Sequence, residues 1–115
     1  MPLSKMNAAD IKRIVARELA KIEHVENAHG INRENVHKFL VEPFAVITDP
    51  DDTTSAPREM WVVLQGRGSA EQGYVIVYDP QENSWGVAEF DPNSTHRGFT
   101  QVVSAPSLGG ALNGM

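Results

Sequence analysis

The spacing of apolar residues changes near residue 43, and this change limits the possible fold more than any other sequence feature. Before residue 43, apolar side chains recur every three or four residues, which places them along one stripe of an α-helix. After it they recur at every second residue, in short runs separated by Asp, Pro and Gly, as in β-strands. A chain with helices first and a run of strands afterwards is expected to form an α+β domain.

The N-terminal part is predicted to hold two helices. The first covers about residues 8–28, with Asn7 suited to cap its N-terminus. A shorter one covers about residues 32–40, because Asn32 is a second capping residue and apolar residues follow it at helical spacing. Pro43 is expected to end this helix, since the residue before a proline avoids the helical conformation.

The C-terminal part is predicted to form a sheet followed by a short helix that Ser107 caps. The expected strands are 44–48, 59–65, 74–78, 85–90 and 99–103, and short turns between them favour antiparallel pairing. The prediction is one α+β domain over residues 1–115, with a helical part (1–41) and a sheet part (42–115). An amphipathic N-terminal helix packs on a four- to five-stranded, mainly antiparallel sheet, and a short C-terminal helix closes the domain.

Two of these strands, 59–65 and 74–78, are apolar on both faces, which is typical of strands in the middle of a sheet. One face is expected to lie under the first helix. The other needs the small helices, a long loop or another subunit to cover it, so a homodimer joined through that face is one of the alternatives. Trp61, Tyr74 and Tyr78 lie on these strands, and they can line a pocket or an interface if the second face is open.

The charge is unevenly distributed along the 115 residues. Residues 1–41 carry seven Lys and Arg against five Asp and Glu, whereas residues 42–115 carry three against ten. The sheet part therefore has a charge of −7 within a total of −5. An acidic chain is a poor match for nucleic acid, and its acidic part is expected to attract a basic protein.

Carboxylates gather where the predicted strands end, and these residues are the candidate partner-binding site. In an antiparallel meander alternate turns lie at the same edge, so the turns after the first and third strands are expected to lie together. A calcium site is an alternative there, although the spacing of an EF-hand loop is absent. The candidate residues are Asp49, Asp51, Asp52, Asp79, Glu82, Glu89 and Asp91.

Catalytic and metal-binding patterns are not found. The chain has no cysteine, which excludes disulfides, thiolate zinc sites and cysteine nucleophiles. The four histidines show no metal-ligand spacing, and Ser94, His96 and Asp91 are too close in sequence for a hydrolase triad. The Gly66–Gly68 loop lacks the third glycine of a dinucleotide-binding turn. The prediction is therefore no enzyme, no cofactor and no metal.

The segment Tyr74–Tyr78 followed by Asp-Pro, a turn and Trp85–Ala88 resembles hairpins of small bacterial domains of unknown function and of toxin-neutralising immunity proteins. The closing segment Ser107–Met115 is similar to the short final helix of some of them. This resemblance implies a small bacterial interaction protein that binds and blocks a basic partner.

With no apolar signal core after Lys5 and no apolar run long enough for a membrane, the expected location is the cytoplasm. The alternative is a small-ligand binder or enzyme with a pocket between the first helix and a curved sheet.

Overall fold

The computed structural model describes residues 6–22, 25, 31–49, 58–65, 74–90 and 99–114. Helices flank a run of strands, as the change in apolar spacing predicts, and the fold is α+β. In chain order the elements are α1 (Ala8–Lys21), the 3-10 turn η1 (Val36–Lys38), β1 (Leu40–Asp49), β2 (Arg58–Gln65), β3 (Tyr74–Asp79), β4 (Ser84–Phe90), β5 (Phe99–Ala105) and α2 (Leu108–Asn113). The last four strands lie within two residues of their predicted bounds.

Helix α1 begins at the predicted cap but ends earlier than predicted. The side chain of Asn7 accepts a hydrogen bond from the backbone N–H of Asp10, and the Asp10 carboxylate accepts one from the N–H of Asn7. This reciprocal pair is a capping box. The helix ends at Ile22, whose backbone is extended, rather than near residue 28. The apolar stripe of α1 is buried at Ile11 and Val15.

The second predicted helix is wrong for most of its length. The Asn32 side chain accepts hydrogen bonds from the N–H groups of Glu34 and Asn35, as a capping residue does, but only the single turn η1 follows. From Leu40 onward the chain pairs with β2, so the strand begins before Pro43 instead of after it. The pairing is irregular between Leu40 and Phe44, and a proline without an N–H is tolerated at such an irregularity.

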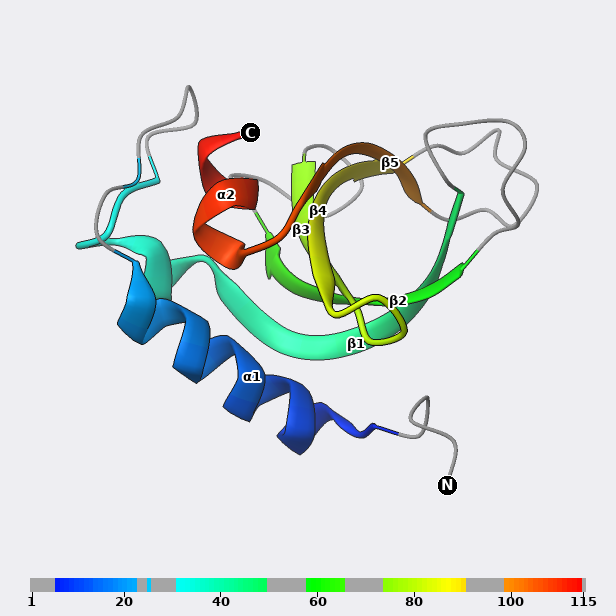
Figure 1. Cartoon of the computed structure of the whole chain (residues 1–115), viewed down its shortest axis with the longest axis horizontal. Coiled ribbons are helices and arrows are strands. Elements are labelled where there is room, and N and C mark those ends of the chain that lie inside the picture. The colour runs from blue at the N-terminus through cyan, green and yellow to red at the C-terminus, as the bar shows by residue number, and fades with distance from the viewer. Residues whose placement is uncertain are drawn as a thin grey trace.

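The described strands form a closed barrel in the order β1-β2-β3-β4-β5 (Figure 1). Neighbours in chain order pair antiparallel, whereas β1 and β5 close the barrel in parallel. Within the described residues this parallel pairing joins Thr48 to Phe99 and Asp49 to Thr100. The end of β1 therefore meets the beginning of β5, and the staggered closure is a feature that local sequence patterns did not indicate.

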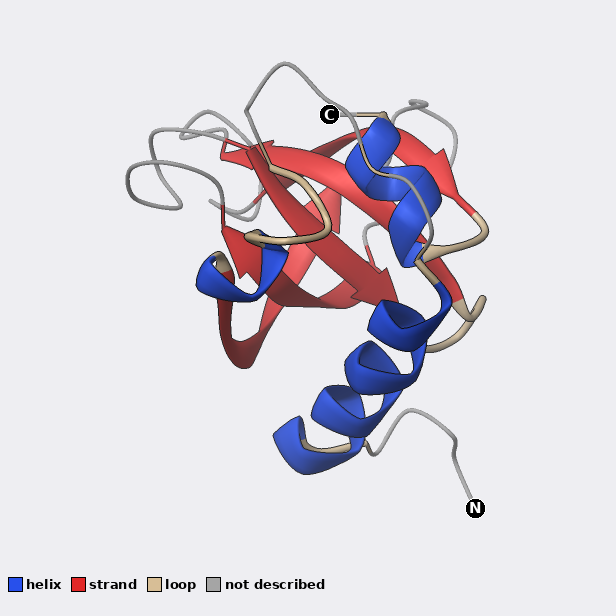
Figure 2. Ribbon diagram, turned by 90° about the vertical axis from the view of Figure 1, so that its left-hand side faces the viewer, coloured by secondary structure: helices blue, strands red, loops and turns tan. Residues whose placement is uncertain are grey.

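Closure gives the barrel an inner and an outer core. The inner core fills the barrel and the outer core packs beneath the helices. Figure 2 shows α1 and α2 along one side of the barrel. The second apolar face of β2 and β3 is the barrel interior, so the chain itself covers it. The inner core holds Met60, Val62, Val75, Val77 and Ala88.

Helix α2 forms where predicted and completes the outer core. The Ser107 side chain accepts a hydrogen bond from the N–H of Gly110 at 3.0 Å, which caps the helix. Leu108 and Leu112 are fully buried, and Leu108 also donates its backbone N–H to a carboxylate oxygen of Glu18 on α1. Docking against the barrel and α1 therefore supports a helix that its glycines would otherwise weaken.

Candidate functional site

A row of three aromatic residues crosses the outer face of the barrel. Directly paired residues on antiparallel strands point to the same face. Trp61 on β2 pairs with Tyr78 on β3, which pairs with Trp85 on β4. Ala45 and Ala105 continue the row on β1 and β5. The aromatic row, defined here as Trp61, Tyr78 and Trp85, is thus a product of strand register rather than of closeness in sequence.

Tyr78 is a buried member of the core, and it also borders a pocket between α1 and the β3–β4 turn, together with Ile14 and Asn83. It is 2% exposed, and its hydroxyl donates a hydrogen bond of 2.7 Å to the side-chain oxygen of Asn83 in the following turn. Burial raises the pKa of the Tyr78 hydroxyl, and the charge of Asp79 raises it further. Asn83 has a φ of 50°, a left-handed conformation that asparagine tolerates better than most residues.

Asp79, one of the predicted partner-binding residues, lies inside the turn that follows β3. It is 2% exposed, and one carboxylate oxygen accepts hydrogen bonds from the N–H groups of Gln81 and Glu82. An aspartate that accepts from the backbone two residues ahead stabilises the turn. This carboxylate is therefore occupied by the hairpin and is not presented to a partner.

The other predicted acidic residues are distributed over the barrel. Glu82 and Glu89 are exposed, and they stand at opposite ends of β4, so they do not form one cluster. Tyr74 is half-buried and pairs with Glu89 across β3 and β4. The side chain of Asp49 is not described. The predictions for Asp51, Asp52 and Asp91 lie outside the described residues.

The staggered closure brings together two acidic positions that the sequence analysis placed apart. On β5, Thr100 pairs with Glu89 on one side and with Asp49 on the other. Two strands flanking a third lie roughly 10 Å apart, twice the spacing of neighbouring strands. Asp49 therefore shares a register position with Glu89. The register through β2 also keeps the ends of β1 and β3 at one edge of the sheet, since Ala45 pairs with Trp61 and Trp61 pairs with Tyr78.

Beyond the aromatic row, the outer face of β1 and β2 is exposed. Ile47 on β1 pairs directly with Glu59 on β2, and Ala45 pairs with Trp61 next to them. Ile47 is 39% exposed, Ala45 and Glu59 are exposed, and Trp61 is half-buried. We call these four residues the β1–β2 patch. It combines an aromatic ring, an aliphatic side chain and a carboxylate on one face, a composition suited to protein contacts.

Of these residues the sequence predicts only Trp61 as part of a pocket or interface, and it does not indicate Ile47 or Glu59. Trp61 has a buried indole N–H without a hydrogen-bond partner in the described structure. Alternation along β1 does place Ala45 and Ile47 on one face. What alternation did not indicate is that α1 leaves this end of the face uncovered, because that depends on where the helix packs.

The described residues contain no group of three histidine or acidic side chains close enough together to ligate a metal ion. Likewise, none of the described helices is both long and apolar enough to cross a membrane. The chain was compared with protein-family models, with curated proteins and with solved structures, and none of them matches it.

Proposed function

We propose that this protein is a protein-interaction module, of the toxin-neutralising immunity type, that binds a basic partner through the β1–β2 patch. The observation that supports the proposal is the direct pairing of exposed Ile47 with exposed Glu59, next to half-buried Trp61. Large exposed apolar side chains are a common feature of protein-binding surfaces, and tryptophan is enriched among the residues that dominate binding energy.

The charge of the chain supports a basic partner. Residues 42–115 carry ten acidic and three basic side chains. In the described part of β1 and β2, Glu59 is exposed and pairs directly with Ile47. Acidic groups around an apolar centre steer a basic protein toward the patch and speed association, and salt weakens this attraction.

The acidic residues at the strand ends extend the same proposal. Glu82 and Glu89 are exposed on the barrel, and Asp49 shares a register position with Glu89 through Thr100. Such carboxylates, away from the apolar centre, act mainly on the association rate. The proposed setting is the cytoplasm of a bacterial cell.

The test is affinity capture from the producing cell, followed by calorimetry with the captured protein. The wild type is expected to capture a basic protein, with an affinity that falls as salt is raised from 50 to roughly 300 mM. Ile47→Ala and Glu59→Lys are each expected to weaken binding about tenfold or more, since central contacts cost more than about 1 kcal/mol when removed.

Glu34→Lys is the matched control, because Glu34 is also exposed but precedes η1 in the helical part. It should bind like the wild type. Equal binding by the Ile47→Ala, Glu59→Lys and wild-type proteins would show that the patch is not the interface. Two further charge-reversal variants test the acidic turns: one replaces both Asp51 and Asp52 by lysine, and the other replaces Glu82 by lysine. Each is expected to slow association.

A further inference from the structure

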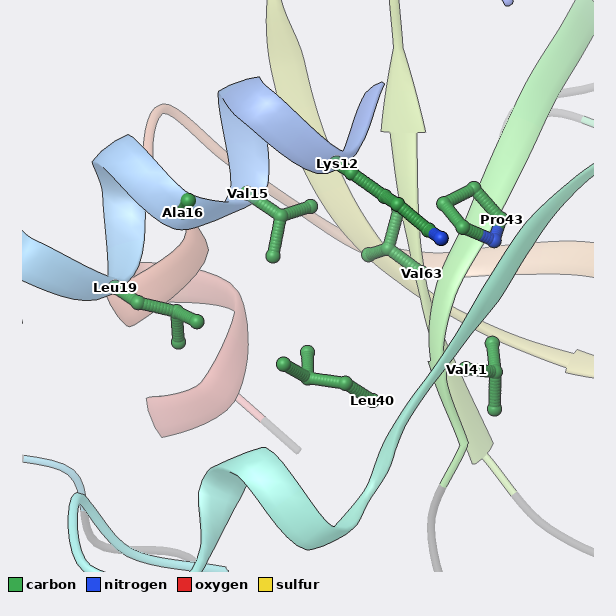
Figure 3. A pocket seen from close by; sticks show the side chains of 8 residues that line it. All are labelled: Lys12, Val15, Ala16, Leu19, Leu40, Val41, Pro43 and Val63. Carbon is green, nitrogen blue, oxygen red and sulfur yellow. The ribbon is translucent and has the colours of Figure 1, made fainter. Parts of the chain in front are cut away.

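A second feature, independent of the β1–β2 patch, is an apolar hollow between α1 and the start of the barrel. It has a volume of about 260 Å³ and lies where the helix and β1 diverge (Figure 3). Four residues of α1 face residues of β1 and β2 across it. The hollow is lined by Lys12, Val15, Ala16, Leu19, Leu40, Val41, Pro43 and Val63.

The lining is aliphatic except at one point. Among the described residues that line it Lys12 is the single charged one, and its side chain extends from α1 toward Pro43 on β1 (Figure 3). Its ammonium group lies 2.5 Å from a carboxylate oxygen of Glu42. The aliphatic stem of a lysine can border an apolar surface while its charge stays in water, and this side chain does so at the edge of the hollow.

The ion pair of Lys12 and Glu42 is exposed and replaceable. The two side chains are 56% and 69% exposed. Exposed pairs of this kind contribute little to stability, because water screens them and two flexible side chains must be held in place. Glu42 itself does not line the hollow. A ligand anion at this edge can therefore take the place of the Glu42 carboxylate, whereas a ligand cation would meet the Lys12 charge.

The volume limits the size of the ligand. Pockets for drug-sized molecules start near roughly 300 Å³, and this hollow is slightly smaller. At roughly 30 Å³ for a water-sized group, it has room for roughly eight carbon atoms. A polar body would leave its hydrogen-bonding groups without partners against these aliphatic walls.

We propose that the hollow between α1 and β1 binds a medium-chain aliphatic carboxylate, with its chain among Val15, Leu40 and Val63 and its carboxylate on Lys12. Binding exchanges the Glu42 carboxylate for that of the ligand on the same ammonium group. The chain fills space that the protein leaves open, and its burial removes apolar surface from water.

The experiment uses the full chain, labelled at Val and Leu methyl groups, and titrates it with octanoate, 1-octanol and octylammonium at pH 7. Octanoate is expected to shift the methyl signals of Val15, Leu40 and Val63. Octanol should bind about fivefold more weakly than octanoate, because it lacks the charge that pairs with Lys12 and an exposed ion pair contributes little. Octylammonium should bind more weakly than octanol, because its charge is repelled by Lys12.

Variants separate the two parts of the site. Lys12→Met should reduce octanoate affinity to that of octanol, and Glu42→Gln should increase octanoate affinity by removing the competing carboxylate. Lys21→Met is the matched control, since Lys21 is exposed on the same helix and pairs with Glu18 outside the hollow. The proposal would be overturned if octanol and octanoate bound equally, or if Lys12→Met still preferred octanoate over octanol. It would also be overturned if only other methyl groups shifted, or if none of the probes bound.

Discussion

Tyr78 and Trp85 lie side by side on β3 and β4, with ring centroids 4.6 Å apart and ring planes inclined by 50°. Both residues are almost fully buried, at 2% and 3% exposure. Tilted aromatic pairs at this separation contribute about 0.5–1.5 kcal/mol beyond the burial of their area. The pair forms the β3–β4 part of the aromatic row and belongs to the outer core beneath the helices.

Replacing Trp85 is expected to destabilise the protein strongly. Trp85→Ala should lower the free energy of unfolding by about 3–5 kcal/mol, because a large buried ring leaves a cavity and Tyr78 loses its partner. Trp85→Phe keeps an aromatic ring and should lose less. Denaturant unfolding measures both, and a loss below about 1 kcal/mol for Trp85→Ala would contradict the burial seen here.

The hydroxyl of Tyr78 is expected to contribute to stability through its hydrogen bond to Asn83. Tyr78→Phe keeps the ring but removes the hydrogen bond to the Asn83 side chain, and should cost about 1 kcal/mol. Asn83→Gly removes the side-chain oxygen that accepts this hydrogen bond, and glycine tolerates the positive φ at this position. A double-mutant cycle should give a coupling energy of about 0.5–1.5 kcal/mol between the two sites. Strict additivity would show that this hydrogen bond does not contribute.

Stability at alkaline pH is expected to depend on Tyr78. Burial raises its pKa in the folded protein, so the neutral hydroxyl is favoured in the folded state. The resulting stabilisation is complete below the unfolded tyrosine pKa near 10 and is lost as pH rises through the folded value. Unfolding curves between pH 8 and roughly 11 should fall more steeply for the wild type than for Tyr78→Phe. Parallel curves would be the contrary result.

The capping box of α1 is expected to act on both stability and titration. Hydrogen bonds from the Asn7 backbone and from the Arg13 side chain lower the pKa of the Asp10 carboxylate. Its contribution is present above the unfolded aspartate pKa and is lost as pH falls through the folded value. Asn7→Ala should cost about 1 kcal/mol at pH 7.

The Asn7→Ala variant can also be tested by measuring the pKa of the Asp10 carboxyl group by NMR. Without the Asn7 side chain the first turn of α1 is expected to fray, and the Asp10 pKa should move up toward its ordinary value. Asn7→Ser is the control, because serine is also a good capping residue. An Asp10 pKa that stays equally low in Asn7→Ala would show that the first turn stays formed and that the backbone N–H of residue 7 still binds the Asp10 carboxylate without the cap.

Local patterns in the sequence predicted most elements, because their causes are local. The stripe beginning at Ile11 and the caps at Asn7 and Ser107 identify helices within a few residues. Period-two runs identify the strands. The failure at Leu40 to Pro43 has a non-local cause: Leu40 pairs with Leu64 on β2, and that pairing decides between helix and strand for an ambiguous segment.

The candidate site was predicted less well than the fold. The clustering of acidic residues at strand ends predicts a surface carboxylate at Asp79, although an aspartate followed by proline at a hairpin is also the pattern of a turn-stabilising side chain. Ile47 and Glu59 were missed because their exposure depends on the position of α1. The alignment of Asp49 with Glu89 follows from the stagger of the closed barrel, which no single strand encodes.

The direction of the β1–β5 pairing has a consequence for evolution of the fold. In the described barrel each strand reverses the direction of the one before, and the ring closes after an odd number of strands. Its first and last strands must then run the same way, whatever residues they contain. Substitutions at Thr48 or Phe99 can tune this pairing but cannot reverse it. Inserting or deleting a whole strand would make the closing pair antiparallel. The number of strands therefore determines the direction of this pairing, and homologues with five strands should keep it parallel.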